Sequence, residues 1–267
     1  MLSEMFKLPF MPIIFKKVKT ILLLLFICCN ACKPKPPINV SDGFETNELS
    51  DIWSKDRMES KALTFQSTIV RNGHSAAQIT LHTGDTFEKG EGKSKDSERD
   101  ELREADDLFS VEGKTYEQHF SLFLPADFPI VPTRLVIAQW KQYCNGNGLC
   151  SDDSPVMAIR YVSGKLYVTL QESDGERTTV YQTKEEIRNR WLNFKFKFRF
   201  SRTNNGLVEA SLNDSTIIQY KGVTAYTSAK GYKDKSYFYF KMGLYRDVMP
   251  KPMTIYIDDY SKKEVVE

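Results

Sequence analysis

A short polar segment near residue 100 has the spacing of one face of a β-strand. It is Arg99–Arg103, which reads RDELR. Side chains alternate between the two faces of a strand, so Arg99, Glu101 and Arg103 share one face. Such a triplet could bind an anionic ligand, or it could be a cross-strand ion network that only holds a sheet together.

A second segment, Tyr239–Tyr245 (YFKMGLY), repeats this spacing far along the chain. Tyr239, Lys241 and Tyr245 share one face, and the residues predicted to point into a core are Phe240, Met242 and Leu244. Arginines, a lysine and a tyrosine on one sheet surface suit an anionic polymer with an acidic C–H bond, as in a uronic acid. The alternative is that these tyrosines are ordinary strand aromatics.

The third polar segment is Gln139-Trp140-Lys141. Alternation puts Gln139 and Lys141 on one face, and Trp140 is therefore predicted to pack in the core.

These segments need strands to position them, and period-2 patterns recur between turn signals from residue 38 onward. The clearest is Phe194–Phe200, with four aromatics on one face and three cations on the other. The other predicted strands are Ala77–Leu81, His119–Leu124, Leu135–Gln139, Leu166–Gln171, Val208–Leu212, Tyr237–Tyr245 and Met253–Ile257. Lys184–Arg190 is expected to form a short helix.

About a dozen strands in roughly 230 residues predict an all-β fold, a two-sheet antiparallel sandwich or jelly roll. In such folds a concave sheet commonly forms the polymer groove. The cations Lys195, Lys197 and Arg199 are interpreted as the solvated face of a half-buried strand.

Residues 1–31 read as a signal peptide. Lysines precede the apolar run Ile21–Cys29, which is too short to span a bilayer. A small residue directly before Cys32 resembles a lipoprotein cleavage site, where Cys32 would be acylated; simple secretion is the alternative. Residues 32–41 would be a Pro/Lys-rich tether and residues 42–267 one domain. We expect an exported protein, anchored to an outer membrane or cell surface or secreted.

Only two of the five cysteines, Cys144 and Cys150, lie in the domain of residues 42–267. An oxidising environment favours a disulfide between them. A metal site is the weaker alternative, because no histidine or second cysteine pair lies close in sequence.

The net charge is misleading until the leader is removed. The whole chain is +2, and the four lysines and Glu4 of residues 1–31 account for +3, which leaves about −1. Binding of a polyanion must therefore come from a local stripe of charge, and generic nucleic-acid binding is disfavoured.

In the order Arg-x-Glu-Leu-Arg, Gln-x-Lys and Tyr-Phe-Lys-x-Gly-x-Tyr, the three segments resemble the jelly-roll polysaccharide lyases. That group includes alginate lyases of family seven, glucuronan lyases of family twenty, heparin lyase I and some ulvan lyases. The Gln-Trp pair is most similar to the glucuronan lyase and heparin lyase I branch. The resemblance covers residues 42–260 and includes Phe120–Pro129 (FSLFLPADFP), Val136–Trp140 (VIAQW), the Asn213 turn and Ile257–Asp259 (IDD).

The resemblance implies β-elimination at a uronate, for which no metal or nucleotide is needed. By position, Arg99 and Gln139 would neutralise the substrate carboxylate, so that the C5 proton can be removed as charge develops. Tyr245 would protonate the leaving glycosidic oxygen and often also act as base. Glu101 would orient the arginines.

Further residues would bind the polymer. The resemblance assigns this role to Lys241 and Arg103. Arg246 is a further candidate for substrate binding, and positive charge from Lys241 and Arg246 beside Tyr245 would favour a phenolate. The remaining candidates at the border of the groove are Tyr239 and Tyr143.

Lys141 stands where the family usually has a histidine. A lysine can act as base when its pKa is depressed; alternatively Lys141 binds a carboxylate or sulfate and Tyr245 makes both proton transfers. A third candidate is His82, which follows a predicted strand and precedes the loop leading to Arg99. The histidines expected to be structural are His74 and His119.

Related sandwich domains often hold a calcium ion between the N-terminal segment and the last strand. Asp42, Glu45 and Asp258 are hard oxygen ligands in those places. The alternative is that they are surface or capping carboxylates.

The leading interpretation is an exported, monomeric lyase that cleaves a 1,4-linked uronic-acid polysaccharide. Glucuronan, ulvan and heparin-type glycans are favoured over alginate. A non-catalytic glycan-binding surface protein of the same fold is the alternative, because Lys141 replaces the usual histidine. A glycoside hydrolase is disfavoured, because no strand carries the two flanking carboxylates that hydrolysis requires.

Overall fold

The computed structural model describes residues 35–54, 58–86, 96–143, 154–171, 177–227, 232 and 236–266. The signal peptide, Cys32, Cys144 and Cys150 lie outside the described residues, so lipidation and the disulfide stay predictions. Residues 1–36 and 37–267 are separate units, and the fold is that of the second. Within the described ranges, no helix is long and apolar enough to cross a membrane.

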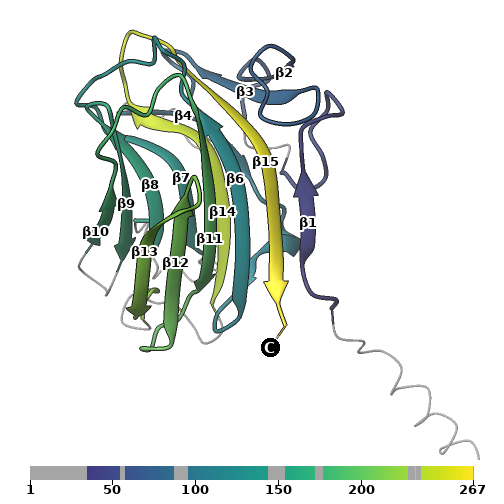
Figure 1. The fold of residues 1–267 in the computed structure, drawn as a ribbon, viewed down its shortest axis with the longest axis vertical. Coiled ribbons are helices and arrows are strands. Elements are labelled where there is room, and N and C mark those ends of the chain that lie inside the picture. The colour runs from purple at the N-terminus through teal and green to yellow at the C-terminus, as the bar shows by residue number, and fades with distance from the viewer. Residues whose placement is uncertain are drawn as a thin grey trace, which may run out of the picture. The chain divides into compact units, whose positions relative to one another are not determined.

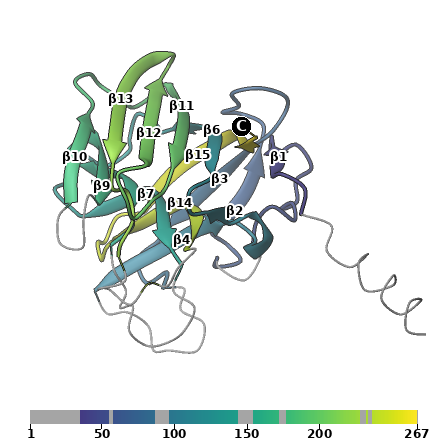
Figure 2. The ribbon, with the colours of Figure 1, turned by 90° about the horizontal axis from the view of Figure 1, so that it is seen from below.

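The folded unit consists of two antiparallel sheets that lie face to face (Figures 1 and 2). The eight-stranded sheet has the spatial order β13 (Ser215–Gly222), β12 (Gly206–Leu212), β11 (Trp191–Arg199), β6 (Thr115–Phe123), β15 (Met253–Val265), β3 (Ala76–Leu81) and β2 (Leu63–Gln66), with β1 (Asn39–Asp42) paired to β15. The seven-stranded sheet has the order β10 (Arg177–Gln182), β9 (Lys165–Gln171), β8 (Met157–Val162), β7 (Leu135–Gln142), β14 (Tyr237–Asp247) and β4 (Ser97–Arg103), with β5 (Ser110–Val111) paired to β14. The predicted all-β sandwich is confirmed.

Aromatic side chains from both sheets form the core between them. Phe120 of β6 packs against Phe240 of β14 with ring centroids 5.5 Å apart, and Trp140 of β7 lies 4.7 Å from the same ring. Trp140 is 1% exposed, as alternation predicts. In β11 the phenylalanines are buried, whereas Lys195 on the outer face pairs with Asp214. The cation row of β11 is therefore the solvated face.

The predicted helix at Lys184–Arg190 is wrong. The described chain has one short 3-10 helix, Asp106–Leu108, and none here. The Glu186 carboxylate accepts hydrogen bonds from the backbone N–H of Ile187 and from both the backbone and the guanidinium of Arg188. These local bonds compete with the helical pattern.

A buried ion pair joins β4 to β14 on the core side of the seven-stranded sheet. Arg246 Nη2 lies 2.8 Å from Glu98 Oε2, and both side chains are 0% exposed. Arg246 Nη1 also donates to the carbonyl of Lys251 at 2.6 Å. The prediction that Arg246 binds substrate or lies beside the Tyr245 hydroxyl is therefore wrong, because its side chain points into the core.

We expect Arg246→Met to lower the free energy of unfolding by about 3–5 kcal/mol, because it leaves the Glu98 carboxylate buried without its partner. Lys195→Met, which removes an exposed pair, should cost less than about 1 kcal/mol. Urea denaturation of the two variants measures the difference. Equal, small losses would contradict a structural role for the Arg246 pair.

Asp100 is a second polar group on the core side of β4, and it is 0% exposed. Its Oδ1 accepts the backbone N–H of Glu59, and its Oδ2 has no hydrogen-bond partner among the described residues. Burial, together with the negative charges of Asp85 and Glu59, raises the pKa of Asp100 to about 7. The neutral form is thus favoured in the folded state below about pH 7.

This pKa links stability to pH. Unfolded chains release the Asp100 proton near pH 3.8, whereas the folded protein retains it up to about pH 7. The folded state therefore binds more protons in this window, and its stability falls as the pH rises. Relative to Asp100→Asn, whose amide does not titrate, wild-type stability should fall by about 2–4 kcal/mol across the window. Urea denaturation of both proteins at several pH values in this range measures the difference. If their free energies of unfolding change with pH in the same way, Asp100 does not hold the proton.

Candidate functional site

The three polar segments meet on one face of the seven-stranded sheet. We call this the site face; it is the face turned away from the eight-stranded sheet. In the pairing of β14 with β4, Tyr245 lies opposite Arg99, Gly243 opposite Glu101 and Lys241 opposite Arg103. On its other side, β14 pairs Lys241 with Gln139 and Tyr239 with Lys141.

Tyr245 lies between two arginines. The guanidinium carbon of Arg99 is 4.1 Å from the centre of the Tyr245 ring, and that of Arg134 is 4.8 Å away. Arg134 Nη1 also donates to the Tyr245 hydroxyl at 3.2 Å. Positive charge therefore lies close to the ring and within hydrogen-bond reach of its oxygen.

Arg134 is held in place by Asp247. Its Nε donates to Asp247 Oδ1 at 2.8 Å and its backbone N–H to Oδ2 at 3.1 Å. Burial works to lower the pKa of Arg134, but the hydrogen bonds to Asp247 and Tyr245 raise it above its ordinary value. Sequence reasoning missed Arg134, because it belongs to no motif and precedes its strand by one residue.

Glu101 is the acidic centre of the site face and is 2% exposed. It accepts a hydrogen bond from Gln139 Nε2 and another from Lys241 Nζ, the latter at 3.5 Å. Gln139 is itself 3% exposed. Glu101 thus orients the amide and the ammonium, whereas the predicted partners were the arginines.

Gly243 lies between Lys241 and Tyr245 on β14 and contributes no side chain to the site face. A Cβ atom there would clash with the carbonyl oxygen of Asp100, and the φ angle is +148°. Close approach of β4 to β14 therefore requires glycine at this position.

An aromatic cluster forms the other end of the site face. The rings of Phe109 and Tyr239 stack on each other with centroids 5.4 Å apart, and Arg103 lies with its guanidinium carbon 5.0 Å from each centroid and pairs with Asp106 at 2.7 Å. Tyr143 lies edge-on to Tyr239 at 6.4 Å and is 41% exposed. Phe109 had not been predicted; it follows the short helix and precedes β5, outside any strand pattern. Flat rings beside a cation suit a sugar ring bearing an anionic group.

The register separates Lys141 from Tyr245. Lys141 lies opposite Tyr239, which is six residues before Tyr245 on β14, or roughly 20 Å of extended strand. The structure therefore does not place Lys141 next to the Tyr245 phenol.

His82 lies closer to the Arg99 end of the sheet. Its Nδ1 is 3.3 Å from Asp85 Oδ2, and its side chain is 55% exposed. The carbonyl of Asp85 accepts the backbone N–H of Arg99, and Thr86 forms a bridge with Arg99. Hydrogen bonds thus connect the His82 loop directly to the strand that carries Arg99.

The predicted calcium ligands do not converge. Asp42 accepts hydrogen bonds from Ser50 and Trp53, whereas Asp258 accepts the backbone N–H groups of Arg71 and Asn72. Glu45 accepts the backbone N–H of His74. The part of the chain that the structure describes contains no group of three acidic, histidine or cysteine side chains able to hold a metal ion. These carboxylates brace loops instead.

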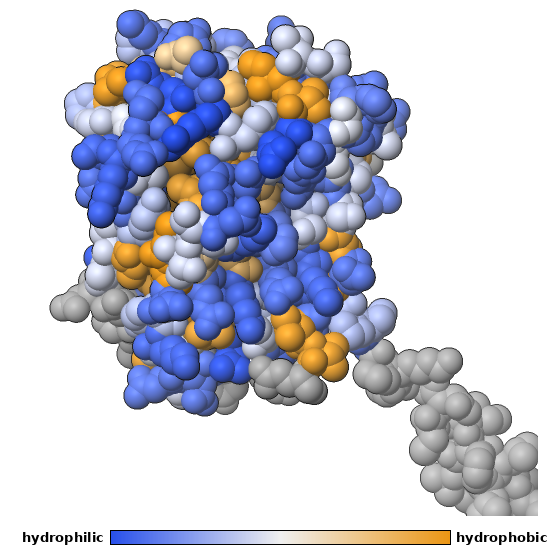
Figure 3. Space-filling model, in the orientation of Figure 1, coloured by the Kyte–Doolittle hydropathy of each residue, from blue (hydrophilic) through white to orange (hydrophobic). Residues whose placement is uncertain are grey.

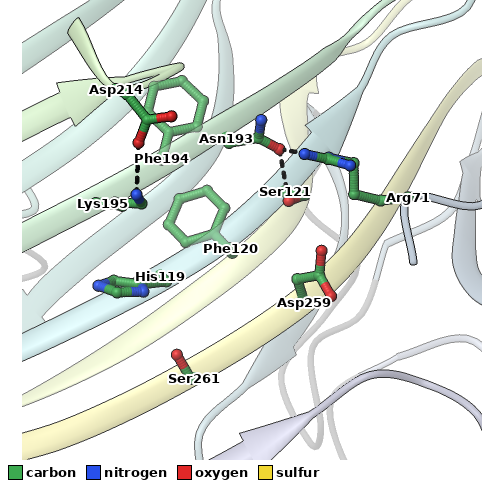
Figure 4. A pocket seen from close by; sticks show the side chains of 10 residues that line it. All are labelled: Arg71, His119, Phe120, Ser121, Asn193, Phe194, Lys195, Asp214, Asp259 and Ser261. Atoms are coloured by element: carbon green, nitrogen blue, oxygen red, sulfur yellow. Dashed lines mark hydrogen bonds and ion pairs between the residues drawn. The ribbon is translucent and has the colours of Figure 1, made fainter. Parts of the chain in front are cut away.

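A hollow on the eight-stranded sheet contains none of the motif residues (Figure 4). It has a volume of about 220 Å³. Its polar groups bind one another: Asn193 Oδ1 accepts hydrogen bonds from Arg71 and Ser121, and Lys195 pairs with Asp214. The face of the molecule toward the viewer in Figure 3 is mainly hydrophilic, with scattered hydrophobic residues. Because the hollow lacks the motif residues, we place the candidate site on the seven-stranded sheet, where these residues meet.

Comparison with solved structures shows the same fold in two polysaccharide lyases and in a cellulose induced protein. The chain is similar to an endo-β-1,4-glucuronan lyase from the fungus Trichoderma reesei, with a TM-score of 0.65 and 17% identity over 85% of this chain and 95% of that one. It is similar to the alginate lyase AlgAT5 from Polysaccharide Lyase family 7, with a TM-score of 0.52 and 16% identity over 78% and 85% of the two chains. A third similar structure is the cellulose induced protein Cip1, with a TM-score of 0.53 and 12% identity over 84% and 96%.

At these identities the structural likeness shows the fold alone, and a search of curated proteins gives no match. The family itself follows from the sequence. The family model described as Polysaccharide lyase matches residues 44–261, which is nearly the whole folded unit. The chain therefore belongs to the polysaccharide lyase family.

Proposed function

We propose that this protein cleaves a 1,4-linked uronic-acid polysaccharide by β-elimination. The observation that supports it most directly is Tyr245 held between Arg99 and Arg134, with Arg134 hydrogen-bonded to the phenol oxygen. A proton donor flanked by two arginines on the site face suits a polymer whose carboxylate lies beside the reacting carbon.

In the proposed reaction, Arg99 and Gln139 offset the charge of the uronate carboxylate. A base then removes the C5 proton, the C5–H electrons form the C4–C5 double bond, and the C4–O bond breaks. Tyr245 gives its proton to the departing glycosidic oxygen. Cations on both sides of Tyr245 stabilise the negative charge that remains on its oxygen.

We assign the base role to His82. The Asp85 carboxylate beside Nδ1 fixes the ring and leaves Nε2 for the substrate proton. Tyr245 acting as both base and acid is the alternative. Lys141, opposite Tyr239 and six residues from Tyr245 along the strand, is assigned to substrate binding.

Glucuronan is the first substrate to test, followed by ulvan and heparin-type glycans and then alginate. The similarity to a glucuronan lyase has the highest TM-score of the three structures compared above, and the concentration of arginines around Tyr245 favours an acidic polymer. We further propose that the protein acts outside the cell as a monomer, tethered through Cys32 or secreted.

Wild-type protein incubated with each polymer should raise the ultraviolet absorbance of the new C4–C5 double bond with at least one of them. Tyr245→Phe should lower this rate by about 10²–10⁴-fold, because it removes the proton given to the leaving oxygen. Binding of the polymer in an affinity gel should change little, since the ring remains. Flat absorbance with retarded migration would instead identify a non-catalytic glycan-binding protein, and undiminished turnover by Tyr245→Phe would refute its role.

His82→Gln tests the base. We expect kcat to fall by about 10²–10⁴-fold with polymer binding nearly unchanged. Lys141→Gln is the matched comparison; it should raise KM and leave kcat within a few-fold, because it removes binding that is equal in the ground and transition states. Full turnover by His82→Gln would assign both proton transfers to Tyr245.

A further inference from the structure

A row of residues crosses the site face at the level of Tyr245. Tyr245 lies opposite Arg99 on β4 and opposite Val136 on β7, and Val136 in turn lies opposite Arg160 on β8. Residues opposite one another in neighbouring strands share a face. Arg160 therefore faces the same surface as Tyr245, two strands away, which is about 10 Å.

Arg160 has no acidic partner among the described residues. Its one hydrogen bond there runs from Nε to the Thr169 hydroxyl at 3.2 Å. Burial, together with the positive charges of Arg177 and Arg134, lowers the pKa of Arg160 to about 10. Arg177 lies opposite Gln171 at the outer strand of the same sheet.

An arginine that is partly buried beside other cations destabilises the folded protein unless an anion compensates for it. Two other arginines show the opposite pattern. Arg246 pairs with Glu98 in the core, and Arg134 on the site face pairs with Asp247. The lack of an acidic partner for Arg160 among the described residues thus points to a counter-ion supplied by a ligand.

We propose that Arg160, Arg177 and the Thr169 hydroxyl form an anion subsite for an acidic group on a sugar flanking the one that reacts at Tyr245. This inference rests on the proposed lyase function and narrows its substrate. The polymer carries acidic groups on more than one sugar within reach of the site face, as carboxylates of successive uronates or as sulfates. It runs across the strands from β14 toward β10.

The first test is binding, measured in the Tyr245→Phe background so that the polymer stays intact. Arg160→Gln should weaken binding of sulfate-free glucuronan about ten-fold at low salt. The slope of log affinity against log salt should fall by about one, because one fewer counter-ion is released. Arg160→Lys should keep that salt slope. Arg199→Gln, the same exchange on the outer face of β11, should change neither quantity.

Two further polymers identify the anion. Carboxyl-reduced glucuronan should bind wild type and Arg160→Gln equally if the group is a carboxylate. If the group is a sulfate, the difference should appear with ulvan and disappear after its desulfation. Equal binding by wild type and Arg160→Gln on every polymer would overturn the subsite.

Stability separates binding from a structural role. Removing an uncompensated cation should leave the urea midpoint of Arg160→Gln equal to or above that of wild type. A clear drop in the midpoint, with no recovery of binding in Arg160→Lys, would make Arg160 structural and reject the proposal.

The two proposals fail in different ways. If no polymer gives ultraviolet absorbance but binding depends on Arg160, the lyase function fails and the subsite stands. If absorbance rises and KM is the same in wild type and Arg160→Gln, the lyase function stands and the subsite fails. Support for both requires cleavage with a raised KM and a kcat within about two-fold of wild type.

Discussion

The antiparallel pairing of β4 with β14 is the constraint on which the site depends. It sets Tyr245 opposite Arg99 and Lys241 opposite Arg103. A slip of one residue would exchange the two faces of a strand, so the polar set would enter the core. The buried ion pair of Arg246 with Glu98 opposes such a slip, because a slip of β4 would turn Glu98 outward and leave Arg246 buried without its partner. The interior of the sandwich thus specifies the geometry of its surface.

Charge on the site face is distributed unevenly. The side toward β8 and the end at Phe109 therefore differ in the ligand groups that they favour. Glu101 lies at the centre and holds Gln139 and Lys241 through hydrogen bonds. Toward β8, Arg160 has no acidic partner among the described residues, so an anion is favoured there. Toward Phe109, Arg103 is already paired with Asp106 and packs against two stacked rings, which favours contact with sugar rings over strong anion binding.

Errors in the sequence interpretation have identifiable physical reasons. Arg246 was assigned to the site because it is adjacent to Tyr245, yet alternation along a strand already puts a neighbouring residue on the opposite face. The Lys184–Arg190 helix was wrong because Glu186 satisfies the local backbone N–H groups itself. Of the expected calcium ligands, Asp42 and Glu45 lie near one end of the chain and Asp258 near the other. Loop geometry decides whether such carboxylates turn toward one ion or toward nearby backbone N–H groups, and the sequence does not reveal that geometry.

The sequence by itself determined the all-β class, the approximate strands and the face of each motif residue, because alternation is a local property of extended backbone. It also determined the family, because each motif and each framing segment is an unbroken stretch of sequence that can be recognised without the fold. Only the tertiary structure decided which strands are neighbours, and therefore that Arg134 meets the Tyr245 hydroxyl, that Lys141 lies beside Tyr239 and that Arg160 joins the row of Tyr245. Those contacts join residues separated by tens of positions, and strand order and register are set by packing of the whole core, which no short segment encodes.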